Sequence, residues 1–149
     1  MSITPSPRLA GVASVVVLAV SALAAPTATA GTRATEQNGI CEDGEICFYY
    51  GSDLAGSLSD FSPGTRVDDY GDSLSNCYRF ISPGAGQGQC IKNNAESITN
   101  NTDFEVSLHT SGPVGEYDDM TQFIGTHFSE NLDENLKNYN GWHIAYKGI

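Results

Sequence analysis

The chain has 149 residues, about the length of one domain, and 40% of them are hydrophobic. It carries 18 Asp and Glu residues against 7 Lys and Arg residues, which gives a formal net charge of −11. Because so acidic a surface repels other polyanions, we expect no nucleic-acid partner and no anionic membrane partner.

The first 30 residues predict a secretory signal peptide. Arg8 precedes an apolar run at residues 9–25, which is short for a membrane-spanning helix. The small residues Ala28 and Ala30 then form an A-x-A-type cleavage site. We therefore expect a signal peptide at 1–30, a flexible N-terminal tail at 31–39, and one folded domain at 40–149 that is released outside the cell.

Four cysteines lie in the part of the chain that would be secreted. They are Cys41, Cys47, Cys77 and Cys90. An oxidising compartment favours disulfides over metal ligation. Four cysteines allow three pairings, and the pairing with the shortest loops joins Cys41 to Cys47 and Cys77 to Cys90, while the other two pairings remain open.

Short segments rich in aromatic and β-branched residues alternate with glycine and proline along the chain, which predicts an all-β fold. The expected strands lie at residues 46–50, 57–61, 78–81, 104–109, 116–123 and 143–146. In the fourth of them Phe104, Val106 and Leu108 alternate with polar residues, as in a half-buried antiparallel strand. A β-sandwich or a small barrel follows from this pattern.

An internal repeat supports a two-unit architecture. A shift of the chain by 59 residues aligns Gly56 with Gly115, Phe61 with Met120, and Tyr49 with Leu108. In both halves a strand leads through a glycine-containing corner into a second strand. We therefore expect two similar four-stranded units that pack face to face around one core.

Three stretches of sequence carry a family resemblance. They are CEDGEICFYYG at 41–51 with LAG at 54–56, AESITNNTDF at 95–104, and NL at 131–132 with NLKN at 135–138. Together they resemble the secreted Streptomyces metalloproteinase inhibitor family. The resemblance implies a βγ-crystallin-like sandwich of two Greek-key units, stabilised by disulfides, in a secreted and monomeric protein.

The resemblance also implies an activity, which is inhibition of a secreted thermolysin-like metalloprotease by a rigid, substrate-like loop. That family has its disulfide-tied loop in the second repeat, whereas the matching residues 109–115 contain no cysteine. The text around Cys77 is similar to that loop, and Cys77 and Cys90 would bracket it. The candidate inhibitory residues are Tyr78, Arg79, Phe80 and Ile81. In the alternative interpretation they are ordinary strand residues beside a solvated loop.

The resemblance makes calcium the one candidate cofactor, because βγ-crystallin folds often bind this ion through Asp, Asn and hydroxyl oxygens. The nearest match places candidate ligands at Asp68, Asp69 and Asp72. In the alternative interpretation these carboxylates form a solvated turn that keeps an acidic protein soluble. No other cofactor is expected.

Enzymatic activity is not expected. The three histidines, His109, His127 and His143, are widely spaced, and the chain has no zinc, nucleophile-elbow or phosphate-loop motif. Asn100-Asn101-Thr102 is a formal glycosylation sequon. The alternative function is an extracellular binding or structural module, calcium-linked or similar to killer-toxin-like βγ-crystallins, without inhibitory activity.

Overall fold

Eight antiparallel strands form the fold in a computed structural model, which describes residues 36–110 and 120–148. The strands are β1 (Ile46–Tyr49), β2 (Leu58–Phe61), β3 (Arg66–Val67), β4 (Ser97–Asn100), β5 (Glu105–Thr110), β6 (Thr121–Ile124), β7 (Phe128–Asn131) and β8 (Asn140–Tyr146). All described residues belong to one compact unit, Thr32–Ile149. Within the two described ranges, no helix has the length and apolar character needed to span a bilayer.

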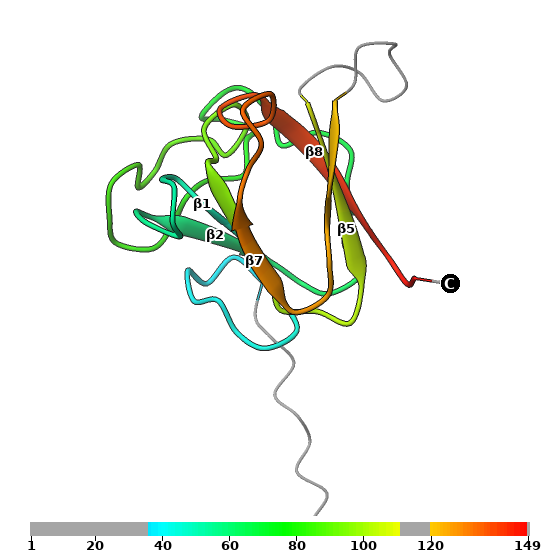
Figure 1. The fold of residues 1–149 in the computed structure, drawn as a ribbon. Coiled ribbons are helices and arrows are strands. Elements are labelled where there is room, and N and C mark those ends of the chain that lie inside the picture. The colour runs from blue at the N-terminus through cyan, green and yellow to red at the C-terminus, as the bar shows by residue number, and fades with distance from the viewer. Residues whose placement is uncertain (1–35, 111–119, 149) are drawn as a thin grey trace, which may run out of the picture. The chain divides into compact units, whose positions relative to one another are not determined.

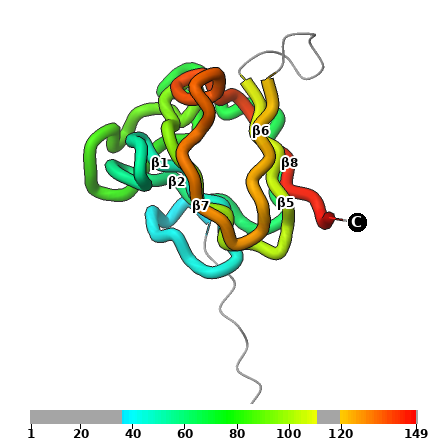
Figure 2. Tube along the Cα trace, viewed as in Figure 1, coloured from blue at the N-terminus to red at the C-terminus, as the bar shows by residue number. Residues whose placement is uncertain are grey.

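The strands form two four-stranded sheets, in the orders β2-β1-β4-β7 and β3-β8-β5-β6. Each sheet takes three strands from one half of the chain and its edge strand from the other half, so β3 and β7 are exchanged. Figure 1 shows the two layers, with β1, β2 and β7 in one and β5 and β8 in the other, and Figure 2 traces the chain between them. This exchange joins the two Greek-key units, and it confirms the predicted all-β sandwich.

The core lies between the sheets and is centred on aromatic rings. Phe48 of β1 packs against Phe61 of β2 and against Tyr70, with ring centroids 5.8 and 5.5 Å apart. Further apolar side chains surround them: Ile46, Val67, Phe80, Ile91, Ala95, Ile98, Val106, Leu108, Ile124, Leu132 and Leu136. Both halves of the chain contribute, so neither unit would bury its apolar face alone.

The repeat is present in the strands, but its register differs from the predicted one, because Phe48 and not Tyr49 corresponds to Leu108. The core positions Ile46 and Phe48 of β1 correspond to Val106 and Leu108 of β5, since each pair lies in the first strand of a hairpin. Residues 111–119, including Gly115, lie outside the described residues. Met120 precedes β6 and is exposed, so the prediction that it matches the buried Phe61 is wrong.

Three strands were not predicted, and one predicted strand is wrong. β4 and β7 have the sequences SITN and FSEN, which lack a clear apolar alternation, and β3 has only two residues. Residues 78–81 form a single bridge, between Arg79 and Cys90, and no strand. The segment does not pair along a neighbouring strand, because it belongs to a loop from which Phe80 enters the core.

The folded part begins earlier than Ile40. Backbone N–H groups of Asn38 and Gly39 donate to the Asp60 carboxylate at 2.9 and 2.7 Å, and the Gln37 side-chain amide donates to Ser59 Oγ at 2.9 Å. The end of the predicted tail is therefore fixed to β2. The predicted signal peptide at residues 1–30 lies outside the described residues.

Candidate functional site

Two disulfides are present, Cys41–Cys47 and Cys77–Cys90, with S–S distances of 1.99 and 2.04 Å. The shortest-loop pairing is confirmed. The first bridge ties the start of the domain to β1. The second encloses residues 78–89, which contain all four candidate inhibitory residues, so it fixes both ends of the predicted loop.

The four candidate residues divide into exposed and anchored side chains. Tyr78 and Arg79 are exposed, Ile81 is half-buried, and Phe80 is fully buried in the core, where its ring meets the Tyr50 ring edge-on at 5.6 Å. Phe80 therefore cannot enter a protease pocket while the domain remains folded. The expectation that its side chain contacts the target is wrong, because its burial makes it the anchor of the loop.

The loop beyond Ile81 lies along β2. The Ile81 N–H donates to the Leu58 carbonyl at 2.8 Å, and the Leu58 N–H donates to Ser82 Oγ at 2.8 Å. Farther along, the Ser57 N–H donates to the Ala85 carbonyl at 2.9 Å. These hydrogen bonds, with further ones between Ser82 and residues 57–58, join the loop to the chain at the start of β2.

Bonds within the loop complete this arrangement. The Phe80 N–H donates to the Gln89 carbonyl at 3.0 Å, and the Gly88 N–H donates to the Phe80 carbonyl at 2.7 Å. Gly86, at φ +82°, lies so close to Tyr50 that a Cβ added there would fall 2.1 Å from Cγ of the ring. Only glycine fits at this position, so the loop backbone packs directly on an aromatic side chain.

The β1–β2 connection, residues 50–57, lies beside this loop, as the hydrogen bond between Ser57 and Ala85 shows; both are at the left of Figure 1. Two consecutive non-glycine residues at its tip, Asp53 and Leu54, have positive φ angles of 57° and 59°. We call residues 51–57 and 82–89 together the two-loop face. Sequence reasoning did not predict the left-handed turn at Asp53 and Leu54, since no local motif indicates it.

Side chains from other strands hold the tip of the β1–β2 connection. Asn131 of β7 accepts a hydrogen bond from the Asp53 N–H at 2.6 Å and donates one to Asp53 Oδ1 at 2.8 Å. Ser97 Oγ of β4 accepts one from the Leu54 N–H at 3.0 Å. Hydrogen bonds from Ser52 to the Glu96 carboxylate lower the pKa of Glu96.

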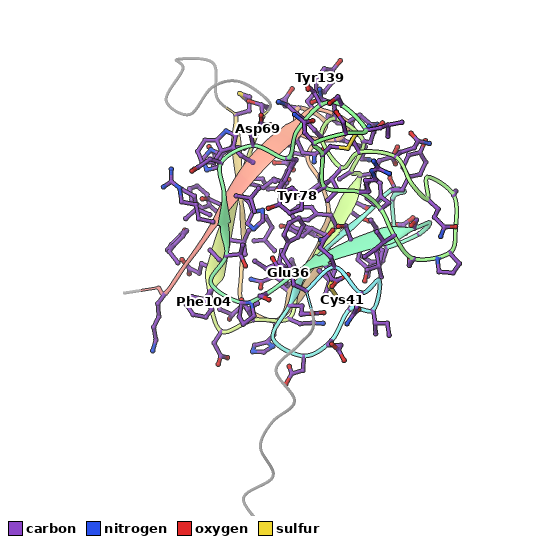
Figure 3. The ribbon with its side chains drawn as sticks, turned by 180° about the vertical axis from the view of Figure 1, so that it is seen from behind. Glu36, Cys41, Asp69, Tyr78, Phe104 and Tyr139 are labelled. Atoms are coloured by element: carbon purple, nitrogen blue, oxygen red, sulfur yellow. A yellow bond between two sulfur atoms is a disulfide. The ribbon has the colours of Figure 1, made fainter. Side chains whose placement is uncertain are left out.

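Two of the three predicted calcium ligands are paired with basic side chains. Asp68 pairs with Arg66 at 2.5 Å, and Asp69 pairs with the Lys92 ammonium at 2.8 Å, a hydrogen bond that lowers the pKa of Asp69. Across residues 36–110 and 120–148, no three His, Cys, Asp or Glu side chains gather into a group that could hold a metal ion. Asp72 is exposed, and Asp69 lies at the end of the domain away from Cys41 in Figure 3.

The three histidines are engaged in three different ways. His143 is buried and hydrogen-bonds with the Tyr70 hydroxyl, His127 pairs with Asp103 at 2.9 Å, and His109 stacks on Trp142 with ring centroids 3.6 Å apart. His109 also hydrogen-bonds with the hydroxyls of Ser107 and Thr121, at 3.1 and 3.0 Å.

A model of the peptidase inhibitor family I36 matches residues 34–117, which is more than half of the chain. The chain belongs to this family. The match confirms the resemblance to the Streptomyces metalloproteinase inhibitors, and it makes the protein a peptidase inhibitor and not an enzyme. A protease partner follows from this membership, and the two disulfides agree with an extracellular protein.

Two solved structures are similar in fold. One, described as "Evolution of the eye lens beta-gamma-crystallin domain fold", has a TM-score of 0.51 and 12% identity, and the alignment covers 74% of this chain and 93% of that one. The other, the N-terminal domain of protein S, has a TM-score of 0.44 and 14% identity, with 69% and 96% covered. A search of curated proteins found no match. The first of these structures supports the βγ-crystallin fold.

Proposed function

We propose that the protein inhibits a secreted thermolysin-like metalloprotease by presenting a rigid surface loop to its cleft. The observation that carries this proposal is the fixation of residues 77–90, which are closed by a disulfide and hydrogen-bonded to residues 57–58. A loop that is already ordered loses little conformational entropy on binding. Family membership supplies the inhibitory role, and the resemblance supplies the class of the target.

The candidate segment would then have two kinds of residue. Tyr78 and Arg79 are exposed at the base of the loop and would contact the enzyme, whereas Phe80 and Ile81 would keep the backbone in place. Gly84 and Gly88 are exposed and carry no side chain, so another protein could approach the loop backbone closely there. Rigidity would also resist cleavage, because a fixed backbone cannot move toward the transition state.

The proposal includes where and in what form the inhibitor acts. We propose a monomer that is secreted after removal of a signal peptide at residues 1–30, with one inhibitor domain in the remainder. A free, disulfide-bonded domain outside the cell would meet secreted metalloproteases directly. Its acidic surface would favour a target whose cleft rim is neutral or basic.

The test is a titration of thermolysin with the oxidised mature protein while hydrolysis of a peptide substrate is followed. We expect stoichiometric inhibition, which weakens in the Cys77→Ser/Cys90→Ser variant. The matched control is Cys41→Ser/Cys47→Ser, which removes a disulfide from another part of the domain. Circular dichroism would establish that both variants remain folded.

Each outcome decides a separate part of the proposal. Absence of inhibition at micromolar wild-type protein would overturn the thermolysin-like target. Equal inhibition by the wild type and the Cys77→Ser/Cys90→Ser variant would overturn the role of the loop. A selective loss in that variant would support both parts.

A further inference from the structure

We propose that Leu54, at the tip of the β1–β2 connection, is the side chain that fills the apolar specificity pocket of the target. This inference rests on the proposed function, because it names the contact residue for the same metalloprotease. The sequence predicted that the contact residues lie at positions 78–81. The structure places a better-suited apolar side chain on the neighbouring loop of the two-loop face.

The chemistry of the pocket selects an exposed apolar side chain. Phe80 is fully buried, so it cannot be inserted into an enzyme without unfolding part of the domain, and Ile81 is half-buried. Leu54 is 38% exposed. Its branched aliphatic side chain suits an apolar pocket, and its position at the tip of a turn allows it to project into a cleft.

Other exposed apolar residues lack this geometry. Phe123 lies within the regular strand β6, and Phe128 begins the regular strand β7. A side chain on a flat sheet cannot easily reach the base of a narrow active-site cleft. Leu74 and Tyr139 are also exposed on turns. Leu54 differs from both because its own φ angle is positive and because its turn belongs to the two-loop face.

The backbone of this turn indicates that its side chains have a role. Asp53 and Leu54 both have left-handed φ angles, a conformation that is unfavourable for residues with a Cβ and uncommon for leucine in particular. Glycine would adopt the same backbone without strain. Strained residues of this kind cluster at ligand-binding sites, where the surrounding structure holds them in place.

The surrounding structure does hold this turn. Asn131 binds the Asp53 N–H, Ser97 binds the Leu54 N–H, and Glu96 binds Ser52. These contacts come from β4, β7 and the residue before β4, so the turn is fixed by the body of the sheet. Within the described part of the chain, the carbonyl oxygens of Asp53 and Leu54 accept no hydrogen bond and remain available to an enzyme.

The same geometry explains how Leu54 could bind without being a substrate. Peptidases act on a peptide whose scissile carbonyl is aligned with the attacking water. With left-handed backbone on both sides, the Asp53–Leu54 peptide bond cannot adopt an extended, aligned conformation while the clamps persist. The Leu54 side chain would fill the pocket, and the Asp53–Leu54 peptide bond would stay out of line with the attacking water.

The experiment measures the inhibition constant for thermolysin with Leu54→Gly. Glycine tolerates φ 59°, so this variant keeps the turn. The relief of left-handed strain offsets the larger entropy of the unfolded chain, and the variant is expected to unfold at a urea concentration close to that of the wild type. Its inhibition constant is expected to rise roughly tenfold or more, since the apolar side chain is lost. The matched control is Leu74→Gly, which removes a leucine that is 61% exposed on another loop.

The outcomes separate this inference from the function on which it rests. If wild-type protein does not inhibit thermolysin, the proposed function itself fails. If wild-type protein inhibits and Leu54→Gly inhibits equally well, the assignment of Leu54 is overturned while the function stands. A loss in Leu54→Gly with unchanged stability, and no loss in Leu74→Gly, would support the assignment.

Discussion

The Tyr70 hydroxyl and Nδ1 of His143 form a hydrogen bond of 2.8 Å inside the core. Tyr70 follows β3 in the first half of the chain, and His143 belongs to β8 in the second half. Both side chains are fully buried, and the rings of Phe48 and Phe61 lie 5.5 and 5.1 Å from the imidazole. One polar contact therefore links the two Greek-key units in an otherwise aromatic environment, where polar groups are costly to leave unpaired.

Removal of the hydroxyl should destabilise the domain. In Tyr70→Phe the ring remains, but Nδ1 of His143 loses its partner, and Nε2 already has none among the described residues. We expect the free energy of unfolding to fall by about 1–3 kcal/mol, the usual effect of a buried polar group left unpaired. Urea unfolding would measure it. Tyr78→Phe is the control, because the exposed Tyr78 hydroxyl has no such buried partner, and an equal loss there would contradict the prediction.

Stability should also decrease as the pH falls. Burial, with a smaller contribution from His109, lowers the pKa of His143 to about 3 from a usual value of 6.5. Between these two values the unfolded chain binds a proton that the folded chain does not, so the stabilising contribution is present above pH 6.5 and is lost toward pH 3. The limiting slope for one such group is about 1.4 kcal/mol per pH unit.

The double variant Tyr70→Phe/His143→Leu isolates this contribution. It removes both partners together, so no buried polar atom of the pair remains, while the carboxylates that titrate in the same range are unchanged. Urea unfolding at several pH values should show a shallower decline for the double variant than for the wild type. Parallel curves would mean that His143 does not have the lowered pKa.

The sequence predicted those parts of the molecule that depend on local pattern and composition. The cysteine pairing followed from an oxidising compartment and short loops, and β1, β2 and β5 followed from aromatic and β-branched runs. Strand β4 could not be predicted from such a run. Its residues Ser97, Thr99 and Asn100 are polar and nevertheless buried, because neighbouring strands and loops satisfy their hydrogen bonds.

The site shows the same limit more clearly. The left-handed turn at Asp53 and Leu54 is held by Asn131 and Ser97, which lie 78 and 43 positions farther along the chain. No local pattern therefore predicts it. Phe80 had two interpretations, a contact residue or a core residue. Only the packing of its ring against Tyr50 decides for the second.

In the fold, hydrogen bonds occupy the Asn100 side chain of the glycosylation sequon. Its amide donates to the carbonyls of Phe104 and Gly125 at 2.7 and 2.9 Å, and its Oδ1 accepts from Thr102. Asn100→Asp would place a carboxylate against those two carbonyls, so we expect a loss of about 2–3 kcal/mol in the free energy of unfolding.

Thermal unfolding of Asn100→Asp would test this, with Asn94→Asp as a control at a less buried asparagine. Because the Asn100 side chain is buried, we also expect no glycan on the folded protein after exposure to a glycosylating extract, as mass spectrometry would check. Modification of folded protein would contradict the burial.

Gly86 and Gly88 offer a matched test of how tightly the inhibitory loop packs. Their φ angles are +82° and +83°, so alanine meets the same backbone strain at both positions. A Cβ at Gly86 would fall 2.1 Å from the Tyr50 ring, whereas a Cβ at Gly88 would have nothing within 4 Å. We expect Gly86→Ala to lower the free energy of unfolding by about 1–3 kcal/mol more than Gly88→Ala does, because it overpacks the contact. Urea unfolding measures the difference, and equal losses would show that the loop can move away from Tyr50 and is not held as rigidly as the proposed inhibition requires.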